Sequence, residues 1–147
     1  LLTVRSEEYE AGVMDLNDNA HEIDRSMLNR RLERLSISAD MKVILSSLID
    51  TTIEIGGKLL SVGARVVAFI FDLAKAYPGV TFGVVAALVL AFLISSIPVI
   101  GPLLSPFLTP LLLIVGIGLG AINDLTDGAM RRRLAGLESQ FKAAGLV

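Results

Sequence analysis

Forty-eight consecutive residues without a charged side chain constrain this sequence more than any other feature. The segment runs from Ala76 to Asn123, and 28 of the remaining 99 residues are charged. An ionised group inside a bilayer costs several kcal/mol, so membrane-embedded helices exclude charge. The sequence therefore predicts an all-α integral membrane protein with polar flanks.

The uncharged segment is long enough for a two-helix transmembrane hairpin within 78–123. A hydrocarbon core of about 30 Å takes roughly 20 helical residues per crossing. We expect the first arm to cover Val80 to Ile97, and the second to start near Ser105. Prolines remove a backbone donor and disfavour helix in the preceding residue, so they mark the bend at 98–110. These prolines are Pro98, Pro102, Pro106 and Pro110.

The connection between the arms is itself uncharged, so the hairpin either spans the bilayer or turns inside it as a re-entrant segment. Ser105-Pro106-x-x-x-Pro110, preceded by Pro98, resembles the proline knot at the bend of oleosin hydrophobic hairpins, although its spacing from Pro98 differs by one residue. The resemblance covers 13 of the 147 residues. It implies a hairpin that turns within an apolar phase, and it carries over no binding residues.

Positive charge flanks the hairpin and is absent from its connection. Arg65 and Lys75 precede the first arm, and three arginines follow the second. Because Lys and Arg favour the cytoplasmic side, both termini of this membrane protein are predicted to be cytoplasmic. The three arginines are Arg131, Arg132 and Arg133.

The segment 124–147 is predicted to form an amphipathic helix capped by Thr126 or Asp124. The three arginines form its basic side. A basic amphipathic helix that directly follows a membrane arm is expected to lie at the interface, with its arginines on anionic headgroups. Its apolar face consists of Met130, Leu134, Leu137 and Phe141.

Small residues recur at four-residue spacing in the hairpin, as in a glycine zipper. Such stripes allow helix backbones to approach closely in lipid. They either close the hairpin on itself or join the subunits of a homo-oligomer, and the sequence leaves both alternatives open. The stripes are Gly79, Gly83, Ala87, Ala91 and Ser95 in the first arm, and Gly116 and Gly120 in the second.

A long amphipathic helix is predicted from 38 to 77, with Ser38 as its N-cap and Gly56-Gly57 as a point where it bends or splits. Its charged residues recur at helical spacing and form one narrow stripe. They are either solvated surface charges or the lining of a water-filled lumen in an oligomer. The candidate lumen residues are Asp50, Glu54, Lys58, Arg65 and Asp72.

The region 1–37 is predicted to be polar, with a short charged helix near its end. Leu1 to Asp24 contains seven carboxylates and a single arginine. This acidic stretch either pairs with the arginines of the following stretch, Arg25 to Arg34, or is the contact for a soluble protein partner. In the following helix, Met27 or Leu28 together with Leu32 and Leu35 form a short apolar seam for a neighbouring helix.

No group of residues suggests catalysis or a cofactor. The chain has no cysteine, and its single histidine, His21, lies far from the hairpin. No carboxylate lies within the uncharged segment, which excludes ion transfer through a buried carboxylate. We therefore expect no enzyme activity, no metal and no cofactor beyond bound lipids. Three arginines without aromatic neighbours and a net charge of -2 also argue against nucleic acid.

Two functions remain open at this point. The first is a homo-oligomeric membrane assembly that forms a pore or conduit, as effectors, toxin-like proteins and virus-encoded channels do. It rests on the small-residue stripes and the polar stripe. The second is a non-conducting membrane anchor or membrane-shaping scaffold that recruits a soluble partner. It rests on the uncharged bend and the basic helix.

Overall fold

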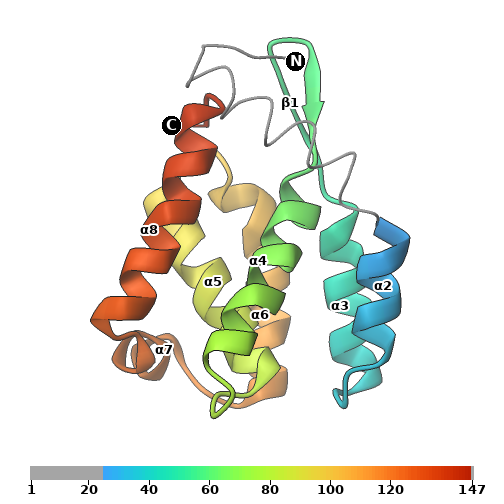
Figure 1. Cartoon of the computed structure of the whole chain (residues 1–147), viewed down its shortest axis with the longest axis vertical. Coiled ribbons are helices and arrows are strands. Elements are labelled where there is room, and N and C mark those ends of the chain that lie inside the picture. Colours follow the sequence, from blue (N-terminus) through green and yellow to red (C-terminus); the bar gives the residue numbers. More distant parts are fainter. Residues whose placement is uncertain (1–24, 147) are drawn as a thin grey trace.

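The computed structural model describes residues 25–146, without the side chains of Leu119 and Asn123. The predicted acidic partner site at 1–24 lies outside these residues. The described chain is a bundle of helices with one short β-hairpin at an end (Figure 1), which confirms the all-α prediction. Its elements are α2 (Arg25–Glu33), α3 (Ala39–Ile49), β1 (Ile53–Ile55), β2 (Lys58–Leu60), α4 (Val62–Ala76), α5 (Phe82–Ser96), α6 (Gly101–Val115), α7 (Leu119–Leu125) and α8 (Gly128–Ala143).

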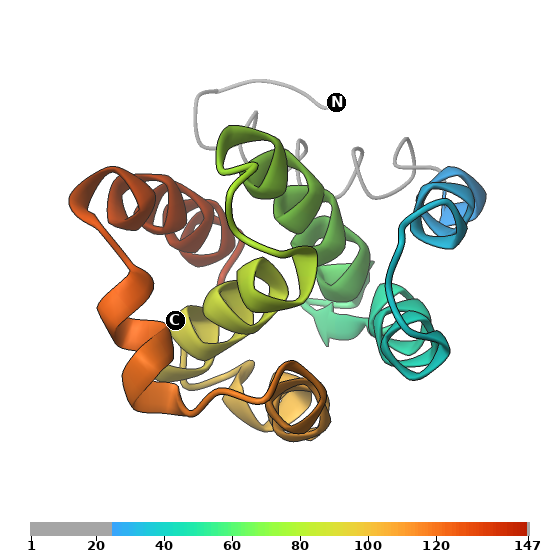
Figure 2. The ribbon, with the colours of Figure 1, turned by 90° about the horizontal axis from the view of Figure 1, so that it is seen from below.

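Helix α5 forms the centre of the bundle, as the view from below shows (Figure 2). It packs against α4, α6, α7 and α8. Every side chain from Val85 to Leu90 is at most 2% exposed. A helix that is apolar around its whole circumference must be buried by protein or by lipid, and here the neighbouring helices bury it.

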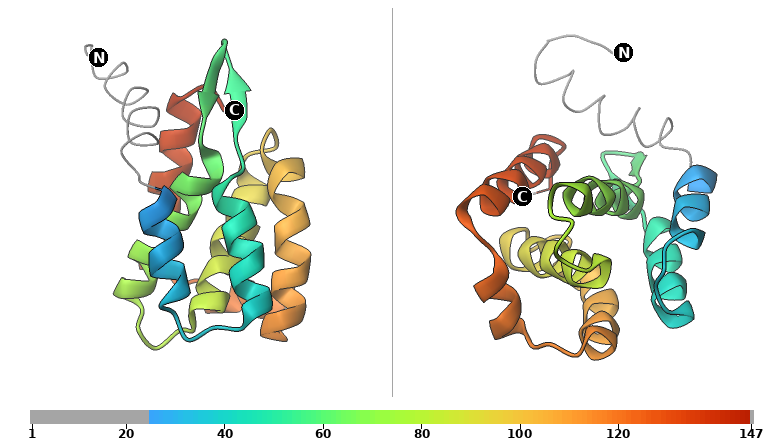
Figure 3. Two further views of the ribbon diagram at one scale, coloured as in Figure 1. Left: turned by 90° about the vertical axis from the view of Figure 1, so that its right-hand side faces the viewer. Right: turned by 60° about the horizontal axis from the view of Figure 1, so that its bottom comes forward.

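Within residues 25–146, no helix is both long and apolar enough to span a membrane. Helices α5 and α6 have 15 residues each. The predicted transmembrane arms are therefore not supported by this fold, although the hairpin itself is present. The two helices lie antiparallel, side by side, and are joined by a tight turn at 97–100 (Figure 3).

The second arm begins earlier than predicted. Helix α6 starts at Gly101 instead of near Ser105, because Pro102 occupies its first turn, where a missing backbone N–H costs little. Pro106 and Pro110 lie inside the helix. The hydroxyl of Ser105 donates to the carbonyl oxygen of Gly101 at 2.8 Å. It adds a hydrogen-bond donor to a helix whose prolines have no backbone N–H.

The helix predicted from 38 to 77 is two helices, because a β-hairpin separates α3 from α4. Gly56 and Gly57 form its turn with φ values of 59° and 79°, a left-handed conformation that disfavours residues with a side chain. Ile53 pairs with Leu60 and Glu54 with Leu59. The predicted N-cap of the first helix is confirmed, since the Ser38 hydroxyl accepts from the Met41 N–H at 3.1 Å.

Helices α3 and α4 meet without space for a side chain at Gly63. A Cβ atom on this glycine would overlap the carbonyl oxygen of Leu48. The Gly63 N–H donates to the carbonyl oxygen of Thr51 at 2.9 Å. This close approach sets how the chain re-enters the bundle after the β-hairpin.

Helix α8 is capped one residue after the predicted Thr126, by Asp127, whose carboxylate accepts from the Met130 N–H at 2.8 Å. The apolar face predicted for α8 is buried inside the bundle, where α8 packs towards α5, and does not face outwards. An interfacial position with this face in lipid is therefore not supported.

Candidate functional site

The solvent-exposed residues of the uncharged segment form a surface without charge. Between Ala76 and Ile122, 17 residues are exposed and none is charged, whereas 15 of the 33 exposed residues in the rest of the described chain are charged. Exposed positions accept charge readily, and protein surfaces use it for solubility. Burial of α5 in a protein core therefore does not account for this lack of charge.

We call these exposed residues the charge-free surface. It comprises the turns that flank α5, the outer face of α6 and, after α6, Gly116, Gly118, Gly120 and Ala121. Helix α6 lies at an outer edge of the bundle (Figure 3). Leu113 at its end is 78% exposed and Ile114 is 37% exposed.

The outer face of α6 also carries backbone acceptors. A proline has no N–H, so Pro106 cannot bond to the carbonyl of Pro102, and Pro110 cannot bond to that of Pro106. Pro102 and Pro106 are exposed. All four predicted bend prolines lie in or directly before α6, with Pro98 in the turn.

The middle of the small-residue stripe of the first arm packs inside the bundle. A Cβ atom on Gly83 would lie 2.6 Å from the Met41 Cε and 3.4 Å from the Val115 Cγ2, so this position brings α5 against α3 and α6. Ala87 is fully buried. Ala91 is half-buried, while Gly79 and Ser95 are exposed.

The glycines of the second arm pack differently. Gly116 ends α6 in the left-handed conformation, with φ of 79°. A Cβ atom on Gly116, Gly118 or Gly120 would meet nothing within 4 Å. These glycines thus do not close the hairpin on itself, and a role between subunits stays a prediction.

The candidate lumen residues do not share one helix. Asp50 ends α3, Glu54 and Lys58 lie on the two strands, and Arg65 and Asp72 lie on α4. Because Glu54 pairs with Leu59 and Lys58 with Ile55, their side chains leave opposite faces of the hairpin. Arg65 is half-buried and has an interaction partner. The β-hairpin therefore interrupts the stripe that a single helix would carry.

The arginines at 131, 132 and 133 are all exposed on α8. Contact with lipid headgroups through them remains a prediction.

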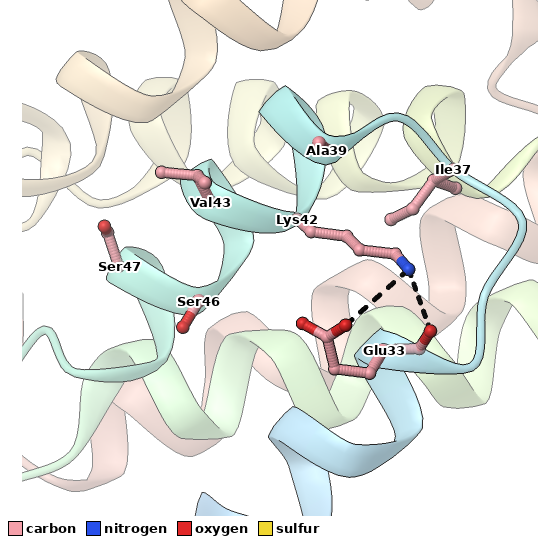
Figure 4. Close-up of a pocket in the computed structure, with 7 residues that line it drawn as sticks. All are labelled: Glu33, Ile37, Ala39, Lys42, Val43, Ser46 and Ser47. Atoms are coloured by element: carbon pink, nitrogen blue, oxygen red, sulfur yellow. Dashed lines mark hydrogen bonds and ion pairs between the residues drawn. The ribbon is translucent and has the colours of Figure 1, made fainter.

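Two hollows on the surface lie beside α2. The first lies between α2 and α3 and contains a matched pair of charges (Figure 4). The Lys42 ammonium donates to the Glu33 carbonyl oxygen at 2.8 Å and lies 3.9 Å from the Glu33 carboxylate. The second lies at the ends of α2 and α4 and contains basic and aromatic side chains. Of these, the sequence pattern singled out only Lys75, as positive charge before the first arm.

No family model matches this chain, and no curated protein or solved structure matches it. Among the described residues, no group of three or more His, Asp or Glu side chains is arranged to hold a metal ion. The functional argument therefore depends on the surfaces described above.

Proposed function

We propose that this protein inserts into membranes: the α5–α6 hairpin leaves the bundle, enters the bilayer and, with other copies of the chain, forms a pore or conduit. The observation that carries the proposal is the charge-free surface. A segment that must enter hydrocarbon excludes charge at every position. A segment that serves only as a protein core excludes it from buried positions alone.

The bundle is suited to storing such a hairpin. Helix α5 is apolar on all sides, and burial by protein or by lipid satisfies it equally. The helices around it are amphipathic, with apolar faces towards α5 and charged faces outwards, as in α4 and α8. If lipid acyl chains replace these amphipathic helices around the hairpin, no charged side chain of the hairpin comes into contact with lipid.

Insertion requires the two helices to lengthen. At about 1.5 Å per residue, 15 residues reach only about 22 Å, short of the roughly 30 Å of a hydrocarbon core. The uncharged sequence on either side of the turn extends from 76 to 97 and from 101 to 123. Each stretch is long enough to cross, provided that the residues now in turns become helical.

Two crossings per copy cannot enclose a lumen, so conduction requires a homo-oligomer. The exposed glycines after α6 offer surfaces for close contact between copies. Such a protein acts in the membrane, with both termini on the same side of it, and belongs with effectors, toxin-like proteins or virus-encoded channels.

A charge on the outer face of α6 tests the proposal without disturbing the fold. Thr109 is exposed near the middle of α6, so Thr109→Lys is expected to change the free energy of unfolding by less than about 0.5 kcal/mol. A lysine at mid-bilayer costs about 3 kcal/mol, so dye release from liposomes should fall on the order of 100-fold. Denaturant unfolding and dye release measure the two effects.

The matched control is Ser139→Lys, which adds the same charge at an exposed position of α8, outside the uncharged segment. It should leave dye release unchanged. Equal dye release by Thr109→Lys and the parent would refute insertion of α6. If the parent binds and oligomerises on liposomes without releasing dye, the non-conducting scaffold replaces the pore.

A further inference from the structure

A basic cleft with an aromatic floor lies where α2 and α4 end. Its volume is about 380 Å³, and Arg31, Arg34 and Lys75 supply its cations. Phe71 of α4 and Phe82 of α5 supply its aromatic rings. We call it the basic cleft.

The side chains of the basic cleft form a stack that joins three helices. The Arg31 guanidinium lies 4.2 Å from the centre of the Phe71 ring. The Phe71 and Phe82 ring centres are 5.0 Å apart. Contact between a cation and an aromatic face is favourable and leaves the hydrogen-bond donors of the guanidinium free for a ligand.

No carboxylate neutralises the basic cleft within residues 25–146. Glu33, the acidic residue of α2, pairs with Lys42. Asp72 lies one turn before Lys75 on α4 but forms no ion pair with it. Among residues 25–146, three cations therefore surround an apolar floor without a carboxylate partner.

A second cavity continues from the basic cleft. Its volume is about 490 Å³, and it shares Leu35 and Phe82 with the basic cleft. It contains no charged side chain. Its lining combines apolar side chains, among them Met41, Ile114 and Val115, with the hydroxyl-bearing residues Ser36, Ser38 and Thr81. The surface thus changes from cationic to uncharged and mainly apolar across Phe82.

We infer that the two cavities together bind one anionic lipid, with its phosphate on Arg31, Arg34 and Lys75 and an acyl chain along the apolar cavity. Arginine binds phosphate oxygens through paired N–H groups, and lysine adds a point charge. A free phosphate would leave the apolar cavity empty, and a neutral lipid would leave the cations without a counterion. An anionic amphiphile satisfies both parts.

The position of this site gives the lipid a role in insertion. Phe82 is the first residue of α5, so an occupant contacts the point where the hairpin joins the rest of the bundle. Displacement of Arg31 from Phe71 would loosen the stack that holds Phe82. This second step rests on the proposed function, whereas lipid binding does not.

Binding is tested with dihexanoyl phosphatidic acid below its critical micelle concentration, so that no membrane is present. Calorimetry should detect binding to the full chain, with a clearly weaker response to dihexanoyl phosphatidylcholine and to glycerol 3-phosphate. Replacement of Arg31, Arg34 and Lys75 together by methionine should weaken binding on the order of 100-fold. The control replaces Arg30, Lys58 and Lys142 together by methionine and should leave the affinity unchanged, because these three exposed cations line neither cavity.

Two results would overturn the site. The first is equal loss of affinity in both triple variants, which would indicate general charge attraction. The second is failure of the parent to bind phosphatidic acid. In that case these cations serve only to stabilise the negative, C-terminal ends of the α2 and α4 helix dipoles. Because the assay contains no bilayer, a protein that fails to insert can still pass it, so the two proposals fail independently. Circular dichroism verifies that each variant is folded.

Discussion

Dye release by the membrane-bound protein is expected to stop when α5 is tied covalently to α3. Met41 of α3 reaches the backbone of Gly83 in the first turn of α5, so cysteines at these two positions can be joined by a short, reducible bifunctional thiol reagent. The chain has no cysteine of its own. If the hairpin must leave the bundle, the link should suppress release from anionic liposomes to the background of protein-free vesicles, and reductant should restore it.

The matched control ties α5 to α6 instead. The Val115 Cγ2 lies 3.4 Å from a Cβ atom built on Gly83, so cysteines at 83 and 115 can be joined within the hairpin. This link should leave dye release intact, because the two arms can still leave the bundle together. Full release by the linked 41–83 variant would mean that permeabilisation, if present, does not require the hairpin to leave α3.

Gly63→Ala is expected to cost about 3 kcal/mol or more of the free energy of unfolding. The added methyl group would overlap the Leu48 carbonyl oxygen. The clash is with backbone, so no side-chain rotation relieves it, and α3 and α4 must move apart. That movement also strains the hydrogen bond between the Gly63 N–H and the Thr51 carbonyl. Urea unfolding followed by circular dichroism measures the loss.

The control for this substitution is Gly120→Ala. Gly120 is an exposed position in α7 where a Cβ atom meets nothing within 4 Å. Alanine favours helix over glycine by about 1 kcal/mol, so this variant should be as stable as the parent or slightly more so. Similar stabilities for Gly63→Ala and Gly120→Ala would show that α3 and α4 are not packed as closely as described.

Local patterns predicted much of the secondary structure. The cap at Ser38 follows from a side chain that competes for backbone N–H groups. The spacing of Leu28 and Leu32 predicted a buried seam, and both are 1% exposed, whereas the alternative Met27 is 43% exposed. The Gly56-Gly57 pair indicated a break in the helix. That this break is a β-hairpin depends on pairing between two strands, which an analysis of helical periodicity cannot detect.

Other features were accessible only through packing. Gly63 is a lone glycine within a helical pattern, which is a signal for close backbone approach, but its partner Leu48 lies on another helix. The stack of Arg31, Phe71 and Phe82 joins three helices, and no spacing within one helix predicts it. The candidate lumen stripe was wrong as a continuous feature for the same reason, since the hairpin turns Glu54 and Lys58 to opposite faces.

The sequence by itself determined that the chain is helical, that α5 must be buried on every side, and that no charge enters the segment from Ala76 to Asn123. These properties follow from side-chain chemistry and periodicity within single elements. Only the tertiary structure decided what buries α5. Protein and hydrocarbon are equally apolar surroundings for a helix of this kind, so the choice depends on whether the amphipathic helices supply enough apolar surface in the right geometry. In this fold α4, α6, α7 and α8 supply it.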